Sequence, residues 1–177
     1  MSDLSSRVRE AIREVPDFPI EGVNFKDITS LLLDASLSKE ILAKFIEEAK
    51  RVNPDAICAI DSRGFIYGTG IAQALNIPLI LIRKKGKLPC ETIEYSYDLE
   101  YGSATLEIHK NDLPKGSRVL VHDDLLATGG TAEATAALIE KAGSQVIGYS
   151  FLINLTFLPG AEKISKHCED IYAMVEY

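Results

Sequence analysis

The sequence predicts an α/β fold in which helices flank a doubly wound, mostly parallel sheet. Nearly continuous apolar runs, typical of strands buried on both faces, occur at residues 56–60, 78–82, 118–121 and 145–155. Helical patterns separate these runs, and such alternation indicates parallel strands joined by right-handed crossovers. Polar or glycine-rich clusters follow three of the four runs. Because ligands bind beyond the carboxyl ends of the strands in such sheets, we expect the site at that edge.

The first 35 residues are expected to form an N-terminal helix and an arm. Residues 5–15 have an amphipathic pattern, which predicts a helix that ends before Pro16. Residues 16–30 contain two prolines and a glycine and predict an irregular arm. Over residues 38–52, apolar side chains recur at helical spacing with charged residues between them, which predicts a further helix.

The later elements follow from changes in period. One helical pattern follows residues 61–64. A second covers residues 132–142 and ends before Gly143. Residues 103–109 alternate weakly, and residues 171–175 are compatible with a last strand. These elements complete a single expected domain over residues 1–177.

Residues 86–103 lack a clear period and contain two glycines and a proline, so they predict a long loop. Long loops without structure of their own inside compact domains are usually functional. The segment is therefore expected to act as a mobile lid over a site.

Composition and charge exclude several classes of protein. The chain is 46% hydrophobic and 25% charged, which provides a full core and argues against disorder. Its formal net charge of −7 gives no basic surplus for a nucleic-acid partner. Three widely spaced cysteines do not form a disulfide framework or a zinc motif. With no signal-peptide pattern and no apolar stretch of about 20 residues, a cytoplasmic protein without membrane contact is expected.

The strongest motif is the segment 119–131, in which an apolar strand delivers Asp123 and Asp124 to a turn of small residues that opens a helix. Backbone amides can approach an anion closely at such a turn, and the helix N-terminus adds partial positive charge. The expected 5′-phosphate cradle comprises Ala127, Thr128, Gly129, Gly130 and Thr131. Adjacent carboxylates before a phosphate cradle suit the hydroxyls of a sugar phosphate. The alternative is a surface-exposed acid pair beside an ordinary helix cap.

Residues 119–131 resemble the signature by which type I phosphoribosyltransferases bind 5-phosphoribosyl 1-pyrophosphate (PRPP). The wider chain is similar to the adenine-specific members of that family over roughly residues 10–160. The matching stretches are residues 16–29, 61–65, 83–89 and 97–102. The resemblance implies the type I fold with an N-terminal hood and a flexible catalytic loop. It also implies a homodimer that, with Mg²⁺, converts adenine and PRPP to AMP and pyrophosphate in purine salvage.

The resemblance implies cationic contacts to pyrophosphate from Arg63, Lys84 and Lys87. In the family, the turn that holds Arg63 commonly contains a strained non-proline peptide, here Asp61–Ser62. Asp123 and Asp124 would hold the ribose hydroxyls directly or through water and the metal ion. Alternatively, Arg63 is a surface arginine, and the lysines belong to a solvated basic turn.

The resemblance also implies the catalytic and base-binding residues. Glu100 would assist proton movement on adenine while Tyr101 shields the site, although Glu100 is alternatively a solvated acid. Tyr95 and Tyr97 are equally compatible with lid packing. The expected adenine-binding residues are Asn24 through its backbone, Phe25, Lys26 and Leu125. The family often has arginine where this chain has Lys26, and lysine lacks the bidentate fork of arginine.

Two other functions are compatible with parts of the pattern. A 6-oxopurine phosphoribosyltransferase often has a lysine after the phosphate loop, which Asn154 and its neighbours do not supply. A non-catalytic regulator that senses PRPP or a purine usually has an added DNA-binding module and a basic surface. His122, which precedes the two acids, either tunes them or is a core histidine.

We predict that Glu100→Gln lowers turnover ~10²–10⁴-fold, because general acid–base assistance contributes that much to a reaction. The substitution is expected to preserve the fold. Steady-state rates and melting curves of the parent and the variant test both statements. Equal turnover would show that Glu100 is one of the solvated acids.

Overall fold

The computed structural model describes residues 3–98 and 102–177. These residues divide into two compact units, Met1–Lys44 and Phe45–Tyr177. Helix α3 (Ala35–Val52) begins in the first unit and ends in the second, and it is three residues longer at its start than the sequence predicts. The single domain over residues 1–177 stays a prediction.

The first unit contains a small antiparallel sheet that the sequence analysis missed. Its elements are α1 (Leu4–Ala11), β1 (Arg13–Val15), β2 (Phe25–Asp27) and α2 (Thr29–Leu33). The predicted helix over 5–15 is too long, because its last residues pair with β2, Val15 opposite Phe25. Pro16 favours extended backbone at the residue before it, and the amides of an extended segment need partners outside a helix.

The second unit is built on one sheet, which within the described residues has seven strands in the order β5-β6-β4-β3-β7-β8-β9. Strands β4, β3, β7, β8 and β9 are mutually parallel, whereas β6 is antiparallel to both β4 and β5. The bounds are β3 (Ala56–Ile60), β4 (Leu79–Lys84), β5 (Thr92–Asp98), β6 (Ser103–His109), β7 (Arg118–Leu126), β8 (Gln145–Asn154) and β9 (Ile171–Glu176). The mostly parallel sheet that the sequence predicts is confirmed.

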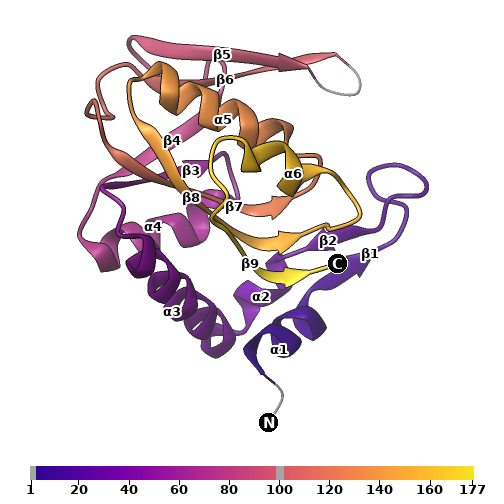
Figure 1. Cartoon of the computed structure of the whole chain (residues 1–177). Coiled ribbons are helices and arrows are strands. Elements are labelled where there is room, and N and C mark those ends of the chain that lie inside the picture. The colour runs from indigo at the N-terminus through magenta and orange to yellow at the C-terminus, as the bar shows by residue number, and fades with distance from the viewer. Residues whose placement is uncertain (1–2, 99–101) are drawn as a thin grey trace. The chain divides into compact units, whose positions relative to one another are not determined.

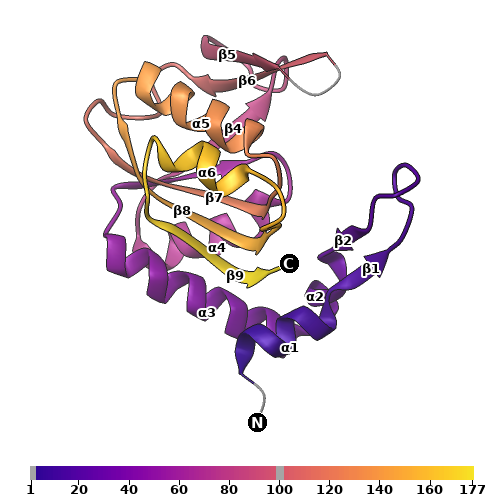
Figure 2. The ribbon, with the colours of Figure 1, turned by 45° about the vertical axis from the view of Figure 1, so that its right-hand side comes forward.

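Helices cover both faces of this sheet, as Figures 1 and 2 show. Helix α4 (Gly64–Leu75) lies on one face, and helices α5 (Gly130–Lys141) and α6 (Gly160–Ser165) lie on the other. All five residues of β3 are buried, as expected of a central strand with helices on both sides. Among the described residues, no helix combines the length and the apolar character that crossing a bilayer requires.

Residues 86–103 are not the structureless loop that the sequence predicts. Strand β5 lies within this segment and pairs with β6 from Thr92 opposite His109 to Asp98 opposite Ser103. The side chains of Ile93 and Tyr97 pack against the core of the unit. Their alternation with polar residues is the strand signal that the sequence analysis overlooked.

The carboxyl ends of β3, β4 and β7 lie at the same edge of the sheet, because β3 pairs in parallel with both neighbours. Strand β3 leads into the turn at residues 61–63, β4 into residues 85–88, and β7 into residues 127–129. The three motifs that the sequence places at strand ends are therefore neighbours in space.

We predict that Phe45→Ala lowers the free energy of unfolding by about 3–5 kcal/mol, because truncating a buried phenylalanine leaves a cavity. Phe45 is 0% exposed, and its ring centroid lies 5.6 Å from that of Tyr67 and 5.0 Å from that of His122. Phe157 is 73% exposed, so Phe157→Ala should change the same quantity by less than about 0.5 kcal/mol. Urea unfolding of the three proteins provides the measurement, and equal losses would contradict this account of the core.

Candidate functional site

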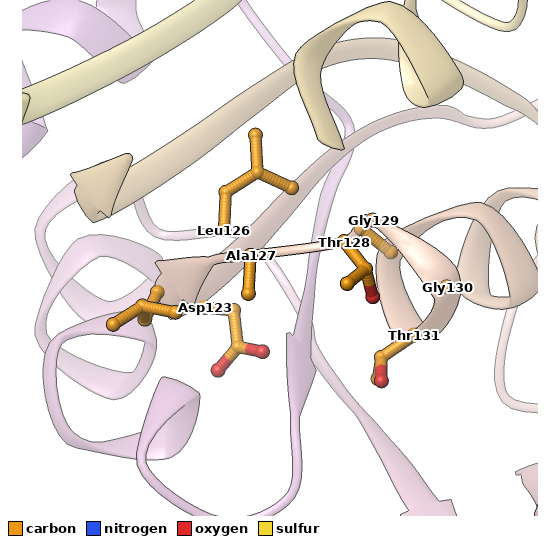
Figure 3. A pocket seen from close by; sticks show the side chains of 9 residues that line it. Asp123, Leu126, Ala127, Thr128, Gly129, Gly130 and Thr131 are labelled. Carbon is orange, nitrogen blue, oxygen red and sulfur yellow. The ribbon is translucent and has the colours of Figure 1, made fainter. Parts of the chain in front are cut away.

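The phosphate cradle predicted from the sequence forms a real concavity between β7 and α5. Residues 123 and 125–132 line a cavity of about 100 Å³. Figure 3 shows the carboxylate of Asp123 and the hydroxyl of Thr131 on the same side of the loop, whereas Leu126 points to the other side. The first residues of the 12-residue helix α5, residues 130–132, line this anion-sized space, as expected for binding a phosphate monoester.

Gly129 gives the cradle its shape. Its φ is +80°, in the left-handed region that glycine adopts without strain. A Cβ atom at this position would lie 2.9 Å from both the Cα atom and the carbonyl oxygen of Gly160, the first residue of α6. Two glycines from distant parts of the chain therefore allow the loop and the start of α6 to touch.

Asp124 is buried and Asp123 is half-buried, so the alternative of a surface-exposed pair is wrong. Asp124 is 6% exposed, and its Oδ2 atom lies 2.9 Å from Nε of Arg63. The backbone amide of Asp124 donates to Oδ1 of Asp123 over 2.8 Å. Burial, followed by the charge of Asp124, raises the pKa of Asp123 well above its ordinary value. Burial also raises the pKa of Asp124, although the charge of Arg63 opposes this shift.

These carboxylates fit a role in binding a cation or sugar hydroxyls. Their oxygens are hard donors of the kind that Mg²⁺ prefers, and burial makes an additional cation or hydrogen-bond donor favourable. Among the residues that the structure describes, no group of three or more histidine, cysteine, aspartate or glutamate side chains forms a metal site. A metal ion here would thus need ligands beyond these side chains, such as the oxygens of a substrate.

His122 is a core histidine, as one of the two sequence interpretations holds. Its Nδ1 atom lies 3.3 Å from Oγ of Ser150, and its ring packs edge-on against Phe45. Burial lowers the pKa of His122 to about 4, so the ring is neutral near pH 7.

The two turns expected to bind pyrophosphate are joined by an ion pair. The Asp61–Ser62 peptide is cis, and the Oδ2 atom of Asp61 accepts a hydrogen bond of 3.0 Å from Nε of Arg83. Arg83 immediately precedes the exposed lysines that the sequence analysis selected. Lys84 and Lys87 are thus brought beside the turn that holds Arg63, but their contact with pyrophosphate stays a prediction.

The β5–β6 hairpin reaches the phosphate cradle through Tyr97. Its hydroxyl lies 3.1 Å from Oγ1 of Thr131, so Tyr97 packs at the start of α5, whereas Tyr95 is exposed. Glu100 and Tyr101 lie outside the described residues, and their catalytic roles stay predictions.

The residues expected to bind the base belong to different units. Leu125 lines the cavity in the second unit. In the first unit, Glu14 accepts hydrogen bonds from Nδ2 of Asn24 over 2.8 Å and from Nζ of Lys26 over 2.6 Å. Phe25 packs edge-on against Phe18, with ring centroids 5.2 Å apart. Lys26 is 8% exposed and forms an ion pair with Glu14. Its expected contact with a purine stays a prediction.

The sequence analysis missed Arg83 and Gly160 as parts of the site. Arg83 opens the basic cluster that follows β4, so its position was a usable signal. Gly160 follows Pro159 after a buried strand, and only the three-dimensional contact with Gly129 reveals its role.

The geometry described above is that of a small anion-sized site with adjacent acids at a strand–loop–helix junction. The sequence model of the phosphoribosyl transferase domain family matches residues 27–171. The chain belongs to this family.

The relatives are adenine phosphoribosyltransferases. That of Cytophaga hutchinsonii is 49% identical over 98% of this chain and 96% of its own length. The crystal structure of the Thermoanaerobacter pseudethanolicus protein superposes with a TM-score of 0.93 at 42% identity, covering 98% of this chain and 99% of that one. The Saccharomyces cerevisiae protein, crystallised with an imino-altritol bisphosphate and adenine, gives a TM-score of 0.91 at 32% identity, covering 97% and 98%. The type I phosphoribosyltransferase fold is confirmed.

We predict that Gly129→Ala weakens the binding of ribose 5-phosphate at least about tenfold, because the new methyl group would displace either the loop or Gly160. Gly116→Ala is a matched control, since Gly116 also has φ +80° but a Cβ atom there would meet nothing within 4 Å. Both variants place alanine in left-handed backbone, which costs about 1 kcal/mol of stability. Only Gly129→Ala alters the cradle. Calorimetric titration that finds equal affinities in the two variants would contradict this role.

Proposed function

We propose that this protein is an adenine phosphoribosyltransferase, which converts adenine and PRPP to AMP and pyrophosphate. One observation carries the proposal: the half-buried Asp123 and the buried Asp124 lie at a phosphate-sized cavity formed by residues 127–131 at a helix N-terminus. This arrangement provides acceptors for vicinal ribose hydroxyls on one side and donors for the 5′-phosphate on the other.

The reaction breaks the bond between the anomeric carbon and the pyrophosphate oxygen and forms a bond from that carbon to an imidazole nitrogen of adenine. Positive charge develops on the ribose, and negative charge develops on the leaving pyrophosphate. Asp123 and Asp124 would hold the ribose next to this developing positive charge. Arg63, Lys84 and Lys87 would stabilise the leaving group, as fixed charges do best where water is excluded.

Mg²⁺ is the cofactor that we propose, bound through oxygens of PRPP and through Asp123 and Asp124. When bound, such an ion would neutralise pyrophosphate charge and orient the substrate. The residues fit this role because the carboxylates of Asp123 and Asp124, one half-buried and one buried, lie together at the edge where the sugar would bind.

The attacking nitrogen of adenine must lose its proton, and Glu100 is the proposed acceptor. The lid that we propose comprises residues 86–103, including β5 and the start of β6. Closing this lid would keep water away from an electrophilic ribose that would otherwise hydrolyse. Tyr97, which already contacts Thr131, would connect such a lid to the phosphate cradle.

Adenine is the proposed base because the relatives described above carry that specificity in their names. The yeast relative contains adenine in its crystal structure. Transfer to a 6-oxopurine is not favoured by these comparisons, and neither is a purely regulatory role. The homodimer and the cytoplasmic location remain part of the proposal through the family resemblance.

A competition assay tests the proposal. We expect the protein, supplied with PRPP, Mg²⁺ and equal concentrations of adenine, hypoxanthine, guanine and xanthine, to form AMP at least about 100-fold faster than the other nucleotides. We expect this ratio because a 6-amino purine and a 6-oxo purine present opposite hydrogen-bond patterns at position 6, so one site cannot satisfy both. A clear preference for another purine would refute the specificity, and PRPP binding without formation of any nucleotide would favour the regulator.

A further inference from the structure

Glu107 is a buried acid that the reaction described above does not use. It is 3% exposed and lies on β6, where Arg83 of β4 and Glu94 of β5 are its neighbours across the sheet. A carboxylate at such a position is costly unless its oxygens are well satisfied. Its partners therefore indicate what it does.

The partners of Glu107 are backbone amides of the basic turn. Its Oε1 atom accepts hydrogen bonds from the amides of Lys87 over 2.8 Å and Leu88 over 2.7 Å. Burial opposes ionisation of this carboxyl, but the amides of Leu88, Gly86 and Lys87 outweigh burial and lower the pKa of Glu107. The side chain is thus a carboxylate at neutral pH, bound to the turn by charge-assisted hydrogen bonds.

The peptide groups of Lys87 are held from two directions. Glu107 accepts from its amide, and Nη1 of Arg83 donates to its carbonyl oxygen over 3.3 Å. The same arginine donates from Nε to Asp61 in the neighbouring turn. The backbone that carries Lys87 is therefore fixed relative to the turn that carries Arg63.

We propose that Glu107 is a positioning residue, whose carboxylate fixes the turn of residues 84–88 so that Lys84 and Lys87 meet the pyrophosphate group. This inference rests on the proposed function. The amides of Lys87 and Leu88 are occupied by Glu107, so the anion would be bound by the lysine ammonium groups. A wrongly placed turn would weaken PRPP binding without affecting the pocket for the base.

The test compares Glu107→Gln with Glu107→Asp in steady-state kinetics. The amide of glutamine is neutral, so its oxygen can keep both bonds to the turn but without the charge that strengthens them. We expect Glu107→Gln to raise the KM for PRPP about tenfold, because a hydrogen bond to a charged acceptor is roughly twice as strong as one to a neutral acceptor. The KM for adenine and kcat should change less than about twofold, and Glu107→Asp, which keeps the charge, should show a smaller rise in the KM for PRPP.

Asp55→Asn is the matched control. Asp55 also accepts a hydrogen bond from a backbone amide, that of Arg118 over 2.8 Å, but it precedes β3 at the opposite end of the strands from the basic turn. This control should leave the KM for PRPP unchanged. An equal rise in the control would overturn the proposal, because general loss of a negative charge would then explain both.

Hydrogen exchange in the unaltered chain gives a second readout that depends on neither a substrate nor a variant. The amide of Leu88 should exchange at least about tenfold more slowly than unstructured amides, although its turn is at the surface. The amide of Lys87 should also be slow, but it reports less directly on Glu107 because it donates to the carbonyl oxygen of Lys84 over 3.2 Å as well. Fast exchange at both would refute the proposal even if Glu107→Gln does not fold. A fall in the KM for PRPP in Glu107→Gln would also refute it, since Glu107 would then act only by repelling pyrophosphate. Absence of AMP formation by the unaltered chain would instead refute the proposed function and leave the exchange result interpretable.

Discussion

Parallel hydrogen bonding of β3 with β4 on one side and β7 on the other is the constraint on which the site depends. It places three turns at one edge of the sheet, and each turn contributes one kind of chemistry. The end of β7 and its turn carry the acids and the backbone amides, the β3 turn carries Arg63, and the end of β4 and its turn carry Lys84 and Lys87. In a chain whose net charge is −7, these neighbouring strand ends gather cationic side chains and helix-terminal amides in one place.

The local parts of this arrangement were predictable from sequence. Strands buried on both faces have a short apolar pattern, and the segment 119–131 contains its strand, acids, turn and helix start in continuous order. Prediction failed where pairing with another segment decides the local structure. Residues 13–15 leave the helical pattern because β2 pairs with them, and β5 exists because β6 provides its hydrogen bonds.

Contacts within the candidate site were harder to predict, because they join residues that are far apart in the sequence. Nothing near Arg63 indicates that Asp124 lies beside it, and nothing near Gly129 indicates that Gly160 needs to be small. Glu107 resembles any strand acid until its amide partners are seen. Burial gives such residues their importance, and burial is a property of the folded chain.

The ion pair between Arg63 and Asp124 has a consequence for the selection of ligands. Arg63 faces Asp124 through Nε, so an anion that approaches the guanidinium also meets the negative charge of a buried carboxylate. A ligand that brings both an anionic group and hydroxyls or a cation can replace each half of the pair at once. We expect this pairing to favour ligands of that kind over simple inorganic anions.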